Sequence, residues 1–168
     1  MKTLLIFRHA QAAHLGDTSD RERPLTEKGV RDAQRMGRLF RGMSPDQVLC
    51  STARRAQQTA HEALSVANST VDIQTISQLY DSDLHHHLNV LRGVATGISR
   101  LLIVGHNPSL ETLVAHLVRR PIIMKTGALA VMALPVQRWD QVTEELSCGL
   151  VGLFCPAMLK KQIDGDEL

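Results

Sequence analysis

The 168-residue chain lacks any long hydrophobic run and has few aromatic residues, with one Trp, one Tyr and three Phe. No apolar stretch approaches the roughly 20 residues that a membrane-spanning helix needs. The N-terminal apolar segment is too short for a signal peptide and lacks a cleavage site. We therefore expect a cytoplasmic protein that does not use a membrane as its partner.

Cysteine is scarce, and the charges of the two signs nearly balance. The three cysteines, Cys50, Cys148 and Cys155, are odd in number and lack the spacing of metal ligands. They indicate reduced, structural thiols rather than a disulfide framework. The formal net charge is only +2 and there is no basic run, so nothing calls for a nucleic acid as partner. A small anionic group on a substrate remains compatible with this balance.

The chain does have enough apolar sequence for one core. With 43% hydrophobic residues it suits a single domain over residues 1–168, whose last several residues we expect to be loose. Strand-like runs alternate with helical periodicity, which predicts an α/β fold of three layers, a mostly parallel sheet with helices on both faces. The predicted strands are residues 3–7, 47–50, 71–76, 101–104 and 128–134, followed by an edge strand at 139–146 and a tail packed through Leu150, Val151, Leu153 and Phe154.

Four helices are expected between these strands. Thr26 can cap a helix that runs to about residue 42, and a second helix fits residues 55–67. A third fits residues 84–94. The fourth is predicted to begin at Asn107 as its N-cap, with Pro108 at the favoured first helical position.

Two histidines follow two of the predicted strands. His9 comes after the first strand and is preceded by Arg8, whereas His106 comes after the fourth. Side chains just past the carboxyl ends of parallel strands converge on one crevice, so we expect His9 and His106 to meet. The helix start at Asn107 would add free backbone N–H groups there, which attract a phosphate. We therefore predict phosphoryl chemistry and place Asn107 among the substrate-binding residues.

Arginines occupy the same predicted edge. The planar fork of Arg8 suits phosphate oxygens, and a neutral His9 can act as a nucleophile. Arg54 and Arg55 open a helix, where positive charge opposes the helix dipole, and an anion in the crevice would explain them. Because successive helical residues diverge by about 100°, the two are not expected to serve one oxygen equally. Taken alone, each arginine could also be an ordinary surface residue.

Five ordered segments resemble the histidine phosphatase superfamily. They are Arg8 to Ala12, Asp20 to Gly29, Ser51 to Thr59, Leu79 to Asp81 and Val104 to Pro108. The likeness runs over nearly all of residues 2–135 and is greatest to the small SixA-type phosphohistidine phosphatase branch, which the compact length without an inserted cap also resembles. It implies a phosphoglycerate mutase-like fold.

This resemblance also implies a role for each polar residue. His9 would be the nucleophile that becomes phosphorylated. The rest of the phosphate pocket would be Arg8, Arg55 and His106. Arg23 and Asp20 would lie at its mouth, where Arg23 could touch phosphate or substrate and Asp20 could orient the substrate or help to move a proton. The surrounding positive charge should lower the pKa of His106, and a bound phosphate dianion should raise it again until the ring is protonated.

One departure from the wider superfamily bears on the substrate. Other branches use a carboxylic acid to protonate the leaving group, but here Asn107 follows His106, and Asp81 and Asp83 lie in no mutase-like segment. The P–N bond of phosphohistidine is labile and needs less help than an alkyl ester. We therefore predict a phosphatase without metal or organic cofactor that hydrolyses phosphohistidine, on a phosphorelay protein, through phospho-His9.

Two other functions stay open at this point. One is a small-molecule phosphomonoesterase or mutase that depends on Asp20 or Asp81, and the other is a noncatalytic phosphate-binding module, which would have no use for a nucleophile. The partner is thus a phosphorylated protein or a small phosphorylated substrate, and a monomer is expected because no spare apolar stripe is apparent. The histidine run 85–87 is not expected to bind metal, since adjacent helical side chains diverge, and we expect it on a partly exposed helix face.

Overall fold

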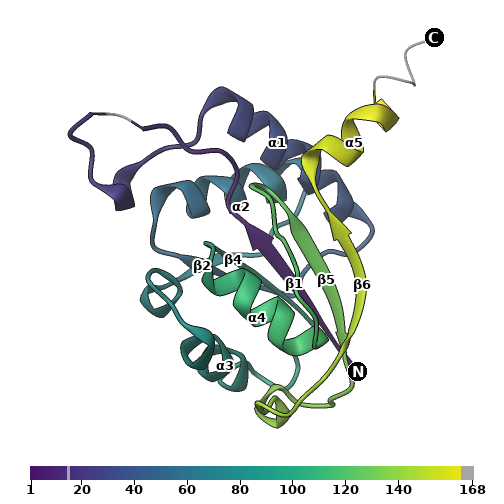
Figure 1. The fold of residues 1–168 in the computed structure, drawn as a ribbon. Helices are drawn as coiled ribbons and strands as arrows, with labels where there is room; N and C mark the ends of the chain where they lie inside the picture. Colours follow the sequence, from purple (N-terminus) through teal and green to yellow (C-terminus); the bar gives the residue numbers. More distant parts are fainter. Residues whose placement is uncertain (15, 164–168) are drawn as a thin grey trace.

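A six-stranded sheet forms the centre of the computed structural model, which describes residues 1–14 and 16–163, with side chains to residue 159 (Figure 1). Its strand order is β3-β2-β4-β1-β5-β6. The strands are β1 Lys2–Arg8, β2 Gln47–Ser51, β3 Ile73–Ile76, β4 Arg100–Gly105, β5 Leu129–Leu134 and β6 Gly149–Phe154. The helices are α1 Glu27–Gly37, α2 Arg54–Val66, α3 Leu84–Arg92, α4 Ser109–Val118 and α5 Pro156–Ile163. The C-terminal end that we expected to be loose, residues 164–168, lies outside the described residues.

The sheet is mixed, and its parallel part positions the two histidines. β2 pairs in parallel with β3 and β4, and β4 pairs in parallel with β1. β5 runs antiparallel to β1, and β6 runs antiparallel to β5. Arg8 lies in register with Gly105 across the β1–β4 ladder, so His9 and His106 leave the sheet side by side. The predicted α/β fold with a mostly parallel sheet is confirmed.

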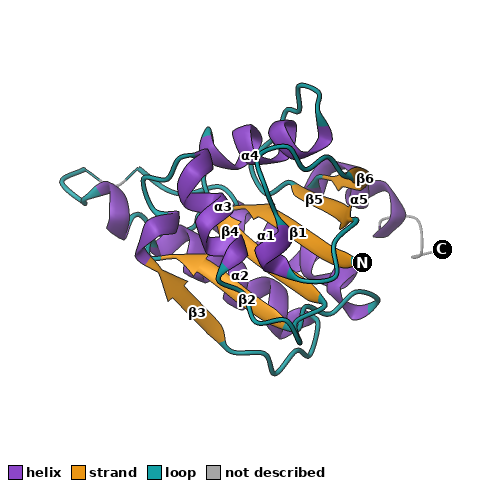
Figure 2. Ribbon diagram, turned by 90° about the horizontal axis from the view of Figure 1, so that it is seen from below, coloured by secondary structure: helices purple, strands orange, loops and turns teal. Residues whose placement is uncertain are grey.

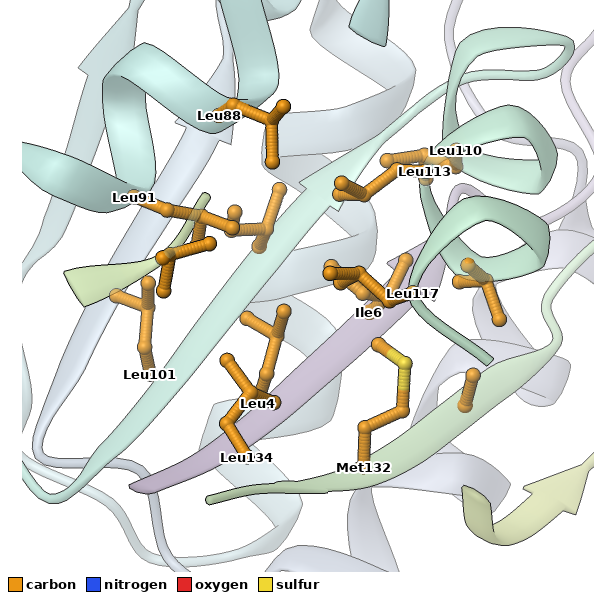
Figure 3. Close-up of a cluster of buried hydrophobic side chains, with 14 of the residues drawn as sticks. Leu4, Ile6, Leu88, Leu91, Leu101, Leu110, Leu113, Leu117, Met132 and Leu134 are labelled. Carbon is orange, nitrogen blue, oxygen red and sulfur yellow. The ribbon is translucent and has the colours of Figure 1, made fainter. Parts of the chain in front are cut away.

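Helices cover both faces of the sheet, as Figure 2 shows. α3 and α4 pack on one face, and Figure 3 shows their leucines against side chains of β1, β4 and β5. Leu4 and Ile6 of β1 point to this face. Leu5 and Phe7 point to the other face, where they meet α1 and α2. A central strand buried on both faces needs apolar residues throughout, which explains why the N-terminal run shows no alternation. Within the described ranges, every helix is too short or too polar to cross a lipid bilayer.

Small residues let α1 and α2 approach each other closely. A Cβ atom built at Gly37 of α1 would overlap the carbonyl oxygen of Ala63 in α2. At the other end of α1, a Cβ at Gly29 would overlap the carbonyl oxygen of Gln11. The Thr26 hydroxyl accepts a hydrogen bond from the Gly29 N–H at 3.0 Å, so the predicted cap is confirmed. These contacts hold the C-terminal part of α2 and the loop that follows β1 close to α1.

The C-terminal third differs from the prediction. Residues 139–146 do not form an edge strand, because Trp139–Gln141 is a short 3-10 helix and the Trp139 ring is fully buried. Its indole N–H donates to the Ile98 carbonyl at 2.8 Å. Burying the single tryptophan with its polar atom satisfied outweighs the strand-like pattern of the segment. The edge strand is β6 instead, where Val151, which we expected to pack, is 68% exposed.

Candidate active site

Strand ends and one helix start build a polar cleft. His9 follows β1, His106 follows β4, and Arg55 comes from the first turn of α2. The ring centroids of His9 and His106 lie 5.1 Å apart, and the ring planes are tilted by 55°. A cleft of about 390 Å³ opens beside His106, and Arg55, Asp20 and Tyr80 line it as well. The predicted meeting of the two histidines is confirmed, and the structure brings Arg55 to them.

The ring of His9 is held with one nitrogen free. The backbone N–H of His9 donates to the Gly105 carbonyl at 3.0 Å, and ring atom Nδ1 lies 2.8 Å from the Ala10 carbonyl oxygen. A carbonyl only accepts, so Nδ1 carries the proton and Nε2 keeps its lone pair. Burial lowers the pKa of His9 to about 4; the Ala10 hydrogen bond opposes this shift, and the charges of Arg55 and Arg8 add to it. At neutral pH, His9 is therefore an uncharged imidazole with Nε2 available for attack.

His106 is also held neutral. Burial, to which the neighbouring His9 and Arg55 add, lowers its pKa to about 3. The predicted direction of this shift is confirmed, although burial rather than cationic neighbours is its largest cause. Nε2 of His106 lies 2.7 Å from the Ser51 hydroxyl, whereas Nδ1 is buried and has no hydrogen-bond partner among the described residues. Protonation of the ring by a bound phosphate dianion stays a prediction.

The two depressed histidine pKa values predict that the fold loses stability in mild acid. Unfolded histidine titrates near pH 6.5, so between about pH 6.5 and pH 4 the unfolded chain binds protons that the folded rings of His9 and His106 do not. The stability contributed by the neutral rings is complete above this window and is lost as the pH falls through it. We expect the free energy of urea unfolding to fall by about 2 kcal/mol or more between about pH 7 and pH 4.5. His106→Gln removes one titrating ring and should show a shallower fall; equal slopes in the two proteins would contradict the prediction.

Two arginines act on this pair of rings, and part of each guanidinium is unsatisfied. Arg8 donates from Nη1 to the Met124 carbonyl at 2.8 Å. Arg55 is 6% exposed and donates from both terminal nitrogens to Asp20. In the part of the chain that the structure describes, the Nε atoms of Arg8 and Arg55 are buried without a hydrogen-bond partner. Arg54 lines a separate cleft, so the two adjacent arginines face different surroundings, and their unequal service to one phosphate oxygen stays a prediction.

Asp20 pairs with the cations of the site and is not poised as an acid. Its carboxylate accepts hydrogen bonds from Arg55 at 2.9 Å, from the Tyr80 hydroxyl at 2.9 Å and from Arg23 at 3.0 Å. Burial raises the pKa of Asp20, but these three hydrogen bonds outweigh burial and hold the pKa well below its usual range. The carboxyl group is therefore ionised at neutral pH. Arg23 lies close enough for its charge to add to the lowering of the His9 pKa by burial.

Asn107 is not the helix cap that the sequence predicted. α4 begins at Ser109 with Pro108 as its N-cap residue, one residue later than expected. The Asn107 side chain instead donates to the Met124 carbonyl at 3.0 Å, the same oxygen that accepts from Arg8. A partner from a distant segment therefore holds the amide away from the helix N-terminus. Asn107 also lines the cleft, and its contact with substrate stays a prediction.

Sequence reasoning missed two residues at this site. The Tyr80 hydroxyl donates to Asp20, and the Tyr80 ring stands edge-on to His106, with centroids 5.8 Å apart and planes at 87°. Ser51 ends β2 and is fully buried against His106. Both residues lie in segments that carry the family resemblance, and Ser51 ends a strand at the same sheet edge as His9. Those positions in the sequence were the signals that could have identified Tyr80 and Ser51 as site residues.

The histidine run divides between solvent and interior. His86 is exposed, with ring Nδ1 2.8 Å from the Asp83 carboxylate. His87 is 1% exposed, and its Nδ1 lies 2.7 Å from the Ser82 hydroxyl, so the predicted partly exposed face is wrong for this residue. Its ring finds polar partners at the start of α3 and can therefore be buried. Across residues 1–14 and 16–163, no three His, Cys, Asp or Glu side chains form a group that could hold a metal ion.

Comparisons of the sequence identify a protein superfamily. The model of the histidine phosphatase superfamily (branch 1) matches residues 4–87. An uncharacterized protein of Mycobacterium tuberculosis H37Rv is 34% identical over 110 residues, which cover 64% of this chain and 66% of that protein. The adenosylcobalamin/alpha-ribazole phosphatase of Escherichia coli K12 is 35% identical over 79 residues, 45% of this chain and 39% of that enzyme. The match to the mycobacterial relative thus spans just under two thirds of its length.

Solved structures share the fold over nearly the whole chain. SixA of Nakamurella multipartitia, a candidate phosphohistidine phosphatase, has a TM-score of 0.81 and 27% identity, covering 92% of this chain and 96% of that one. A protein histidine phosphatase SixA in complex with tungstate has a TM-score of 0.79 and 26% identity, covering 94% and 99%. The fold and its paired histidines define an α/β protein of the phosphoglycerate mutase-like class. Within that class, the chain belongs to the histidine phosphatase superfamily.

Proposed function

We propose that this protein is a phosphohistidine phosphatase in which His9 carries the phosphoryl group during turnover. The observation that carries the proposal is a set of buried nitrogens, without partners among the described residues, on three side chains that neighbour His9. They are Arg8 Nε, Arg55 Nε and His106 Nδ1. Leaving a buried polar atom unsatisfied costs about 1–3 kcal/mol, so such a cluster is expected where a ligand satisfies it. Two of the three groups are cationic, which suits an oxyanion.

The proposed reaction consists of two displacements at phosphorus. In the first, the lone pair of His9 Nε2 attacks phosphorus in line, the P–N bond to the substrate imidazole breaks, and its electron pair returns to the substrate nitrogen. In the second, water attacks phospho-His9 and gives up a proton to solvent, and the bond from phosphorus to Nε2 breaks to release inorganic phosphate. The guanidinium groups of Arg8 and Arg55 stabilise the charge on the phosphoryl oxygens during both steps.

The state of Asp20 supports phosphohistidine over an alkyl phosphate as substrate. Its carboxylate is ionised because three donors hold it, so it has no proton for an alkoxide leaving group. An imidazole that carries a proton on its other nitrogen leaves as a neutral molecule and does not need a strong acid. The SixA neighbour that binds tungstate supports phosphoryl binding with either leaving group, since tungstate, like phosphate, is a tetrahedral oxyanion.

We also infer that the phosphohistidine belongs to a phosphorelay protein, that the enzyme needs no metal or organic cofactor, and that it acts in the cytoplasm. A cleft lined by strand ends and loops leaves room for a side chain presented on a protein surface. All three cysteines, which lie in the described part of the chain, are free thiols, as is usual in a reducing compartment.

Phosphate release from a phosphohistidine-bearing protein domain tests this proposal. With chelator in excess, we expect kcat/KM for this domain to exceed that for a phosphoserine peptide by at least about 100-fold. The same preparation with metal added back is the control for metal dependence, and the rate should not change.

Each other outcome selects a different function. Faster turnover of alkyl phosphates, lost in Asp20→Asn, would replace the proposal by a small-molecule phosphomonoesterase, a function that the similarity to the Escherichia coli phosphatase favours. Phosphate binding without turnover of any phosphorylated compound would leave a noncatalytic binding module.

A further inference from the structure

Ser51 has a buried hydroxyl beside His106, and the proposed reaction assigns no role to it. It is the last residue of β2, and its relative exposure is 0%. Its Oγ lies 2.7 Å from Nε2 of His106 and accepts a hydrogen bond from the Ala53 backbone N–H at 3.3 Å. These are its two hydrogen-bonding neighbours among the described residues.

The proton count of this arrangement decides which nitrogen of His106 carries hydrogen. A serine hydroxyl has one proton to donate and lone pairs to accept with. The Ala53 N–H donates to one of the two lone pairs of Ser51. If the other lone pair accepted from His106, the buried hydroxyl proton would have no acceptor among the described residues, so the hydroxyl donates to Nε2 of His106. A neutral imidazole that accepts at Nε2 carries its hydrogen on Nδ1. In the phosphate-free enzyme His106 is neutral, because burial lowers its pKa to about 3, so this choice of tautomer is open to the ring.

We propose that Ser51 is a positioning residue that holds His106 in the Nδ1–H tautomer, so that Nδ1 presents an N–H donor to a phosphoryl oxygen of the substrate. This inference rests on the proposed function for the identity of the oxyanion. Nε2 is occupied by the hydroxyl, so Nδ1, which is buried and has no partner in the described residues, is the ring nitrogen left for the substrate.

The opposite tautomer would impair the same site. With hydrogen on Nε2, the bare lone pair of Nδ1 would face a phosphoryl oxygen, and two acceptors would repel each other. A donor placed before the reaction also needs no rearrangement as charge shifts in the transition state. Ser51 would thereby act on catalysis through His106 without touching the substrate.

Nitrogen-15 NMR of the histidine rings tests the tautomer directly in the full-length protein at about pH 7, where neutral His106 is expected. The spectrum separates protonated from bare ring nitrogens, and His106→Gln assigns the signals. We expect wild-type His106 to have a protonated Nδ1 and a bare Nε2, and Ser51→Ala to show a mixture of tautomers. Turnover and the affinity for tungstate should each fall by roughly 10- to 100-fold in Ser51→Ala. Ser51→Thr, which keeps the hydroxyl, should retain the wild-type tautomer.

Thr112→Ala is the matched control, because its exposed hydroxyl donates to the Pro108 carbonyl and not to a ring. A protonated Nε2 in the wild type, or an unchanged tautomer in Ser51→Ala, would overturn the proposal. If Ser51→Ala fails to fold, the wild-type spectrum and that of Ser51→Thr still decide. If the tautomer is as expected but phosphohistidine is not hydrolysed, the proposed function fails while the role of Ser51 stands.

Discussion

Replacing His9 with alanine is expected to reduce phosphate release from phosphohistidine by at least about 10⁴-fold and to abolish the phosphorylated form of the enzyme. The neutral ring offers a bare Nε2 because Nδ1 is committed to the Ala10 carbonyl. Alanine provides no atom that can take the phosphoryl group, and the remaining cations can only bind it. Quenching turnover in alkali, in which phosphohistidine survives, and measuring the intact mass should detect one added phosphoryl group in the wild type and none in His9→Ala.

His116→Ala separates this effect from a general loss of histidine. His116 lies on α4 with ring Nε2 2.7 Å from the Glu144 carbonyl, on a surface apart from the cleft residues. It should keep the wild-type rate and the phosphorylated intermediate. A phosphorylated His9→Ala protein would assign the nucleophile to another residue, and His106 would be examined next.

Gly37→Ala is expected to destabilise the fold by about 3 kcal/mol or more. Helix propensity alone would favour alanine over glycine by up to about 1 kcal/mol. The added Cβ, however, overlaps backbone atoms of Ala63, which cannot rotate away as a side chain could. The two helices must therefore separate, and the steric penalty decides the sign. Chemical denaturation should show a lower midpoint, with a loss of activity as α2 and Arg55 shift.

Gly42→Ala is the control for this substitution. Gly42 has φ −96° and ψ −13°, which alanine adopts readily, and a Cβ there meets nothing within 4 Å. It should leave stability unchanged or raise it slightly, since alanine restricts the unfolded chain more than glycine does. A Gly37→Ala protein as stable as Gly42→Ala would show that the helix contact is looser than described.

The parts of the site that the sequence predicted are those set by local pattern. His9 and His106 each follow a short apolar strand, and parallel pairing of those strands brings their ends together whatever the length of chain between them. Arg55 lies at the start of a helix that the sequence predicts over residues 55–67. Such positions follow from secondary structure and topology alone.

Residues whose roles depend on distant partners could not be predicted in this way. Asparagine is a favoured N-cap residue, yet the side-chain amide of Asn107 donates to the Met124 carbonyl instead. The hydrogen bond from the Tyr80 hydroxyl to Asp20 joins segments that lie 60 residues apart along the chain. Trp139 lies in a strand-like segment, but the large ring fits the core only when the backbone turns. In each case a tertiary contact outweighs the local preference.

The hydrogen bonds from Arg55 to Asp20 have a consequence for the release of phosphate in the proposed reaction. Both terminal nitrogens of Arg55 already donate to Asp20, so the guanidinium has an internal counterion. Nη1 donates to the backbone carbonyl of Asp20 and Nη2 to its carboxylate, so inorganic phosphate that binds Nη2 must exchange with this carboxylate, which weakens phosphate binding. When phosphate departs, Asp20 recovers the guanidinium and no buried cation is left unpaired. We therefore expect inorganic phosphate, the product of the proposed reaction, to inhibit phosphate release only weakly when it is added to the assay.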